Sequence, residues 1–234
     1  MRATSGPTDT HGREEVDGYA IYGAVFSVGE TVEFRERIAG QSLARTRAGA
    51  RHVLSHEPIG RIARDPRMLE IASRWLAGPA IPFKATLFDK TPESNWPVAW
   101  HQDTTLPLAM KRDVDGWGPW SEKDGVPYAR APAGAMEGVI ALRLHLDVCT
   151  ELSGPLRVLP GTHNRGILSE AEVERCLLTT DPVDCHVGAG GVVAMRPLIV
   201  HSSARLRSDA PRRVIHIEYA RSLELESGLC LRLA

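Results

Sequence analysis

The stretch VIALRLHLDV, residues 139–148, places apolar and polar side chains in strict alternation. Successive side chains of a β-strand point to opposite faces, so this alternation predicts a strand with two different faces. One face carries Ile140, Leu142, Leu144 and Leu146, and the other carries Ala141, Arg143, His145 and Asp147. The segment therefore predicts a sheet with one apolar face and one face of basic and imidazole groups.

Two further stretches repeat this design. IPFKATLFDK (81–90) sets Phe83, Ala85 and Leu87 against Lys84, Thr86 and Phe88, and RRVIHIEYA (212–220) sets Ile215, Ile217 and Tyr219 against Arg212, Val214, His216 and Glu218. The polar faces could meet solvent, as in many antiparallel sheets, or they could line a cavity inside a barrel. Strands that follow helices, with glycine-rich turns between them, favour a mainly β fold with supporting helices, a jelly-roll-like or cupin-like barrel.

The N-terminal third predicts helices. Ser27 followed by Glu30 has the spacing of a capping box, which predicts a helix to about Ala39. Apolar residues at helical spacing predict a second helix over Arg61–Ala77, ended by Gly78-Pro79.

The domain organisation predicted from these patterns is simple. Residues 1–16 are polar and predict a flexible leader, and residues 17–234 predict a single domain. Residues 104–137 are rich in Pro, Gly and Trp and lack a regular period, which predicts a long lid-like loop.

Composition narrows the class of protein. With 28 Lys+Arg against 29 Asp+Glu there is no excess positive charge of the kind that binds nucleic acid or an anionic membrane. No stretch approaches the roughly 20 apolar residues that cross a bilayer, and the start does not resemble a signal peptide. The four cysteines show no metal-binding or redox spacing. We expect a cytoplasmic enzyme, a monomer or small homo-oligomer, that acts on a small molecule.

A short motif predicts a metal site. In His101-Gln102-Asp103 an imidazole and a carboxylate lie two residues apart, so on a strand both project to the same face. His201 ends an apolar strand that follows the glycine-rich turn GAGG, and it could supply a third ligand. Two histidines and one carboxylate on one side of a metal are typical of non-heme Fe(II) oxygenases. Taken singly, His-x-Asp is a weak signal, and His201 could equally be a buried histidine bonded to the backbone.

Arg212 strengthens the metal hypothesis. It opens the strand after His201, and a hairpin would bring its guanidinium to the same pocket. Iron(II) oxygenases of this type need a fixed cation there to hold the far carboxylate of 2-oxoglutarate.

Three ordered segments resemble one known family. FDKTPESNWPVAWHQD (88–103), LHLDVCTELSGPLRVLPGTH (144–163) and RPLIVHSSARLRSDAPRR (196–213) are similar to the phytanoyl-CoA dioxygenase family of Fe(II)/2-oxoglutarate oxygenases. The resemblance covers roughly residues 81–220 and implies a double-stranded β-helix. It implies Fe(II) on His101, Asp103 and His201, with 2-oxoglutarate and O2 as co-substrates, and it places Arg212, Ser203, Thr86, Lys84 and Arg143 at the 2-oxoglutarate site.

The resemblance also implies a reaction. The family's default is hydroxylation of a C–H bond of a small-molecule metabolite with release of succinate and CO2. Halogenating relatives of this chemistry replace the carboxylate ligand, whereas this chain retains Asp103. Epoxidation and desaturation stay open, as do a zinc or manganese hydrolase or isomerase on the same barrel and a non-catalytic binder. Arg143, Lys111 and Arg112 suggest that the substrate is anionic.

Overall fold

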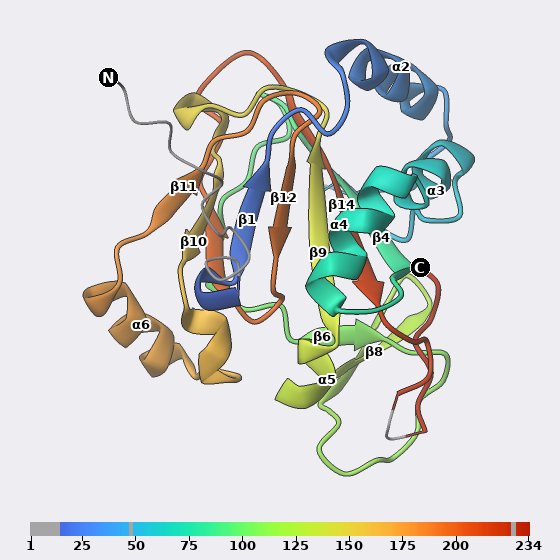
Figure 1. Cartoon of the computed structure of the whole chain (residues 1–234), viewed down its shortest axis with the longest axis vertical. Helices are drawn as coiled ribbons and strands as arrows, with labels where there is room; N and C mark the ends of the chain where they lie inside the picture. Colours follow the sequence, from blue (N-terminus) through green and yellow to red (C-terminus); the bar gives the residue numbers. More distant parts are fainter. Residues whose placement is uncertain (1–14, 47–48, 226–227) are drawn as a thin grey trace, which may run out of the picture.

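The computed structural model describes residues 15–46, 49–225 and 228–234, so residues 1–14 of the expected leader lie outside the described residues (Figure 1). Within them the strands form three antiparallel sheets. The largest runs in the order β1 (Tyr19–Tyr22), β12 (Val192–Met195), β9 (Val139–His145), β14 (Arg212–Ala220), β4 (Ile81–Lys90), β3 (Gly49–Ala50) and β2 (Arg45–Thr46). The second runs β11 (Val183–Cys185), β10 (Leu156–Leu159), β13 (Val200–Ser203) and β5 (Val98–His101).

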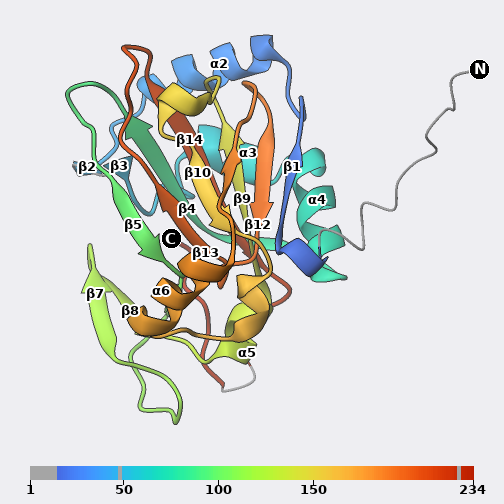
Figure 2. The same ribbon diagram turned by 90° about the vertical axis from the view of Figure 1, so that its left-hand side faces the viewer.

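The chain passes back and forth between these two sheets. It runs from β4 to β5, from β9 to β10 and β11, and then through β12, β13 and β14, alternating between the larger and the smaller sheet. Figure 2 shows the smaller sheet toward the viewer, with the larger sheet behind it. This winding is the double-stranded β-helix, or jelly roll, that the strand pattern predicts.

Helices cover the outer face of the larger sheet (Figure 1). These are α2 (Val28–Ala39), α3 (Glu57–Ala63) and α4 (Pro66–Leu76). Leu142, Leu144, Ile215 and Ile217 are completely buried in one apolar cluster with side chains of these helices. Of the two interpretations of the strands, the barrel is therefore correct: the apolar faces point outward to the helices and the polar faces point inward.

The structure confirms one predicted helix and corrects the other. Ser27 Oγ accepts from the Glu30 amide at 3.2 Å and Glu30 accepts from the Ser27 amide at 2.8 Å, so the capping box begins α2. The continuous helix over Arg61–Ala77 is wrong, because the chain breaks between α3 and α4. Pro66 lacks an amide hydrogen, and the Asp65 carboxylate accepts from the Arg67 amide at 2.9 Å and caps a new helix.

Residues 104–137 are not the irregular loop expected from their composition. They contain the third sheet, in the order β6 (Thr105–Pro107), β8 (Val126–Arg130) and β7 (Trp120–Lys123), followed by α5 (Ala133–Glu137). Asp124 and Gly125 turn between β7 and β8 with positive φ angles of 51° and 77°, as a tight hairpin requires. The strands are too short to show a period in a sequence interrupted by prolines and glycines.

The barrel interior is divided into two parts. One part is an apolar cluster with Ala141, Val158, Val193 and Met195 between the two sheets. The other part holds the buried polar side chains of β4, β9, β13 and β14. Two short 3-10 helices (Glu151–Ser153 and Thr162–Arg165) and α6 (Glu170–Thr179) complete the chain. No helix of the described residues is long and apolar enough to cross a membrane.

Candidate metal centre and its pocket

The two predicted histidine ligands are cross-strand neighbours in the smaller sheet. His101 ends β5 and pairs directly with His201 on β13, and their ring centroids lie 4.2 Å apart. Asp103 follows β5, and one donor atom from each of the three residues lies within 4.8 Å of the others. The structure thus brings together the three predicted ligands.

Backbone hydrogen bonds fix both imidazoles in the orientation that a metal needs. His101 Nδ1 donates to the Ala99 carbonyl at 2.8 Å, and His201 Nδ1 donates to the Ile199 carbonyl at 2.9 Å. The Nε2 atoms are left to face Asp103, at 3.6 Å and 3.7 Å from its two oxygens. Protein metal sites use this arrangement, in which the second ring nitrogen is bonded to the backbone and holds the ligand in place.

Gln102, between the ligand candidates His101 and Asp103, has a structural role. Its side chain points away from the pocket, where the amide nitrogen donates to the carbonyls of Leu198 at 2.6 Å and Gly166 at 2.8 Å. Its carbonyl oxygen accepts from the Leu168 amide at 2.7 Å. The amide therefore anchors the chain end after β5, and Asp103 returns to the side of His101.

The protonation states of His201 and Asp103 favour the binding of a metal cation. Burial lowers the pKa of His201 to about 4, so this imidazole is neutral at pH 7. Burial opposes ionisation of Asp103, but the nearby histidines, His201 first, hold its pKa well below the ordinary value. Burial alone would lower the pKa of His101, and the hydrogen bond to Asp103 outweighs it and raises that pKa. A metal ion would displace the proton of His101.

The three metal-ligand candidates open into a cavity of about 260 Å³ between the two sheets. All five residues predicted for the 2-oxoglutarate site also line this cavity: Lys84, Thr86, Arg143, Ser203 and Arg212. Sequence reasoning did not assign the further lining residues Arg51, Lys90, Lys123, Tyr128 and Glu218. Lys111 and Arg112, which suggested an anionic substrate, are exposed and lie outside the cavity lining.

A cluster of cations forms one end of the cavity. Arg212 is 2% exposed, and it donates from Nη1 to the Gly154 carbonyl at 2.7 Å and from Nη2 to Ser203 Oγ at 3.3 Å. Lys90, its cross-strand partner, donates to Ser203 Oγ at 3.0 Å and to the Ala204 carbonyl at 2.7 Å. Arg143 is buried nearby, close enough for its charge to lower the pKa of Lys90.

This cation cluster (Lys90, Arg143 and Arg212) is incomplete without an anion. Among the described residues none of the three has a carboxylate partner, and the Nε atoms of both arginines are buried without an acceptor. Buried donors and charges normally have partners. A dicarboxylate whose far end enters this cluster would supply them, and the residues present therefore fit 2-oxoglutarate.

A hydrogen-bonded chain crosses the larger sheet from Arg143 toward the opposite end of the cavity. Arg143 Nη1 donates to His216 Nδ1 at 3.1 Å, so the His216 proton is on Nε2, which lies 3.2 Å from Glu218 Oε1. Lys84 Nζ donates to the same oxygen at 2.6 Å. Lys84 thus lies with Glu218 rather than with Arg212, which separates it from the cation cluster.

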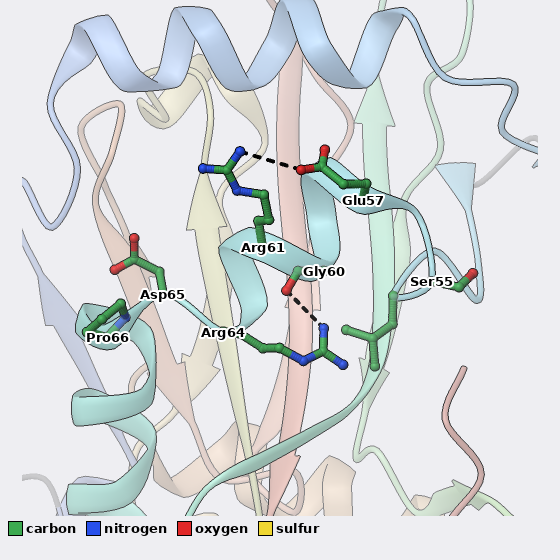
Figure 3. A pocket seen from close by; sticks show the side chains of 8 residues that line it. Ser55, Glu57, Gly60, Arg61, Arg64, Asp65 and Pro66 are labelled. Carbon is green, nitrogen blue, oxygen red and sulfur yellow. Dashed lines mark hydrogen bonds and ion pairs between the residues drawn. The ribbon is translucent and has the colours of Figure 1, made fainter.

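A second hollow, of about 620 Å³, lies at the surface around α3 (Figure 3). Its charged groups already have partners in the chain: Arg61 lies 3.5 Å from Glu57, and Arg64 donates to the Gly60 carbonyl at 3.0 Å. The hollow contains none of the three metal-ligand candidates.

Known proteins share this fold and sequence pattern. L-proline trans-4-hydroxylase of Streptomyces griseoviridis is 28% identical over 193 residues, which are 70% of this chain and 63% of the relative, so the match spans less than two thirds of that protein. The crystal structure of EctD from S. alaskensis matches 97% of this chain and 84% of its own, with a TM-score of 0.70 and 16% identity. SnoN, an alpha ketoglutarate dependent epimerase from nogalamycin biosynthesis, matches 95% of this chain and 83% of its own, with a TM-score of 0.66 and 20% identity.

The sequence also matches a family model over most of its length. Residues 15–214 match that of phytanoyl-CoA dioxygenase. The matched range contains the three metal-ligand candidates, the cation cluster and every strand from β1 to β13. The chain belongs to the phytanoyl-CoA dioxygenase family.

Proposed function

We propose that this protein is an Fe(II)- and 2-oxoglutarate-dependent dioxygenase that hydroxylates a C–H bond of a small-molecule metabolite. One observation carries the proposal: two imidazole Nε2 atoms and a carboxylate converge in the same cavity as a buried, carboxylate-free cation cluster. A metal site alone would serve many reactions. The cluster beside it adds a place for a dicarboxylate.

The residues that would hold the metal and those that would bind 2-oxoglutarate lie mainly on different sheets. His101 and His201 on the smaller sheet, with Asp103 in the turn after β5, would hold the metal and leave positions open for other ligands. Arg212 would bind the far carboxylate of 2-oxoglutarate through its guanidinium group, with Lys90 and Ser203 beside it. Thr86 and Arg143 line the cavity on the same larger sheet and would contact the co-substrate. When bound, iron and 2-oxoglutarate supply the oxidation of a substrate C–H bond by O2, with succinate and CO2 as the other products.

Two features support hydroxylation of a small molecule. Asp103 occupies the carboxylate position of the triad, so the site has a full protein ligand set. The cavity of about 260 Å³ is small even before a co-substrate enters. The related L-proline trans-4-hydroxylase is named for the hydroxylation of one amino acid, which supports a substrate of that size.

The test separates metal binding from 2-oxoglutarate binding. Wild-type protein should bind Fe(II), bind 2-oxoglutarate in its presence, and form succinate under O2. His101→Ala should lose metal binding. Arg212→Ala should still bind the metal, but its affinity for 2-oxoglutarate should fall at least tenfold, because a charge-assisted hydrogen bond contributes about 1.5–3 kcal/mol.

Matched controls are available on exposed residues. His186→Ala and Arg221→Ala change the same residue types outside the cavity and should behave as wild type. Metal binding without any 2-oxoglutarate binding would contradict the proposal and favour a zinc or manganese hydrolase on the same barrel. Equal loss of metal and 2-oxoglutarate in Arg212→Ala would contradict the role of Arg212.

A further inference from the structure

The end of the cavity opposite the cation cluster carries a second set of positive charges. Arg51 follows β3, Lys84 is on the inward face of β4, and Lys123 ends β7 in the third sheet. All three line the same cavity as the metal-ligand candidates. Tyr128 of β8 lies between the lysines: Lys123 Nζ is 4.4 Å from its ring centroid and Lys84 Nζ is 5.8 Å from it.

Only one of these three charges is neutralised within the described residues. Glu218 pairs with Lys84 at 2.6 Å and also bonds to His216. Arg51 and Lys123 have no hydrogen-bonded or ionic partner in the described part of the chain. Burial, followed by the charges of Lys84 and Arg51, lowers the pKa of Lys123, which shows that the three cations act on one another. Arg51 is exposed and Lys123 is half-buried, and two neighbouring positive charges without a carboxylate partner among the residues described, at one end of a cavity, attract an anion.

Contacts with Tyr128 and the β7–β8 hairpin fix the backbone that carries Arg51 and Lys123. His52, next to Arg51, has a left-handed φ of 54°, a strained conformation that persists only where its surroundings hold it. Its Nε2 lies 2.9 Å from the hydroxyl of Tyr128, and the two rings stack with centroids 6.0 Å apart. Lys123 directly precedes the Asp124-Gly125 hairpin turn. His52 and Lys123 therefore both lie against Tyr128, and Arg51, whose side chain is exposed, directly precedes His52.

We propose that Arg51 and Lys123 bind the carboxylate of the substrate, and that this protein oxidises a small carboxylic acid. This inference rests on the proposed function, because it requires the metal and 2-oxoglutarate to occupy the centre and the opposite end of the cavity. A carboxylate suits the guanidinium of Arg51, which can bind it through two parallel hydrogen bonds. Its small size also suits a cavity of about 260 Å³ that must hold the co-substrate as well. Binding at this end would leave the carbon chain of the substrate pointing toward His101 and Asp103.

The test compares acids with their amides, which differ in charge but hardly in shape. The probes are L-proline, L-leucine and cyclopentanecarboxylate, each against its primary amide. Full-length protein loaded with Zn(II) and 2-oxoglutarate, which does not turn over, is titrated with each probe by calorimetry. At least one acid should bind about tenfold or more tightly than its amide. Equal affinity within every pair, or no binding of any acid, would overturn the proposal.

Variants assign the selectivity to particular residues. Arg51→Gln and Lys123→Met should each lower the affinity for the acid about tenfold and leave the affinity for its amide unchanged. The conservative variants Arg51→Lys and Lys123→Arg should recover much of the affinity for the acid. Lys111→Met and Arg112→Gln, on exposed cations outside the cavity, are the matched controls and should have no effect. Selectivity that survives in both Arg51→Gln and Lys123→Met would overturn the assignment.

The same titrations separate this proposal from the proposed function. Zn(II) and 2-oxoglutarate are titrated first, so a protein that binds neither refutes the dioxygenase directly. The acid and amide titrations are then repeated on metal-free protein, where the Arg51 and Lys123 charges are still present. Acid selectivity there, without 2-oxoglutarate binding, would support the carboxylate site alone.

Discussion

Lys90 has an ammonium group buried among other cations. It is 1% exposed, and its hydrogen bonds go only to neutral oxygens, Ser203 Oγ and the Ala204 carbonyl. Burial, followed by the charges of Arg212 and Arg143, lowers its pKa to about 7. Without a bound anion, this residue therefore opposes folding whenever it is charged.

The prediction for Lys90→Met is a gain in stability with a loss of 2-oxoglutarate affinity. The unfolded chain keeps the ordinary pKa of 10.5, so between pH 7 and 10.5 it binds more protons than the folded protein and the wild type gains stability as pH rises. The free energy of unfolding of Lys90→Met should therefore exceed that of the wild type by on the order of 1 kcal/mol at pH 6–7, and by less at pH 10.

Urea denaturation across this pH range measures the difference, and Lys111→Met, on an exposed lysine, is the control. A difference that stays constant from pH 6 to pH 10 would show that the ammonium is not destabilising. Calorimetry with 2-oxoglutarate on the metal-loaded protein measures the expected loss of affinity.

At the level of single residues, the sequence predicts the chemistry but only part of the pocket. The His-x-Asp spacing and the position of His201 predict the three ligand candidates that the structure brings together. Lys90 could have been found as well, because it continues the alternation of Lys84, Thr86 and Phe88 along one face of β4. Arg51 and Lys123 could not have been found in this way. Arg51 follows a two-residue strand and Lys123 ends a strand of a distant hairpin, and only the folded barrel places them together.

At the level of elements, one glycine connects the barrel to its helical layer. Gly190, in the turn before β12, has a φ of +81°, and its carbonyl accepts from the Phe26 amide at 2.9 Å just before α2 begins. A Cβ atom at Gly190 would lie 1.9 Å from the Phe26 carbonyl oxygen. A side chain there would have to separate the turn from the segment that leads into α2.

Gly190→Ala should therefore lower the free energy of unfolding by about 1–3 kcal/mol, through both backbone strain and the lost contact. Gly188→Ala is a matched control two residues earlier in the same turn, where a Cβ would meet nothing within 4 Å. Urea denaturation followed by tryptophan fluorescence compares the two variants. Equal stability of Gly188→Ala and Gly190→Ala would show that the close approach is unimportant.

The sequence predicts elements well where one physical rule decides the outcome. Period-two alternation predicts β4, β9 and β14, because each of these strands has one face against helices and one face in the barrel. The prediction of one helix over Arg61–Ala77 is wrong because the apolar period continues across the Asp65-Pro66 break. The third sheet was missed because three- to five-residue strands are too short for alternation to show.

At the level of the whole molecule, the proposed ligands would link the two sheets. The metal-ligand candidates belong to the smaller sheet and to the turn after β5, whereas Arg212, Lys90 and Arg143 belong to the larger sheet. A molecule of 2-oxoglutarate between the metal and Arg212 would therefore add a link between the sheets to the hydrogen bonds that Lys90 and Arg212 already donate to Ser203 of β13.

Ligand binding should accordingly raise the melting temperature of the whole protein in two steps. A ligand at 100 times its Kd stabilises by about 2.7 kcal/mol, and 1 kcal/mol shifts a domain of this size by roughly 2–4 °C. Metal alone should give the first rise and 2-oxoglutarate a second one of similar size. Differential scanning calorimetry should show no rise with His101→Ala, and with Arg212→Ala the first rise followed by a second one of about half the wild-type size, because a tenfold weaker ligand at the same concentration stabilises by only about 1.4 kcal/mol. A second rise of full wild-type size in Arg212→Ala would contradict the bridging arrangement.

The alternation of strands between the two sheets also has a consequence for synthesis of the protein. A growing chain that ends before His201 contains only two of the three ligand candidates. In such a chain β5 also lacks β13, the strand with which it pairs. Lys90 lacks its cross-strand partner until β14 has been made. The three metal-ligand candidates and the cation cluster can therefore come together only after the chain has been made as far as β14.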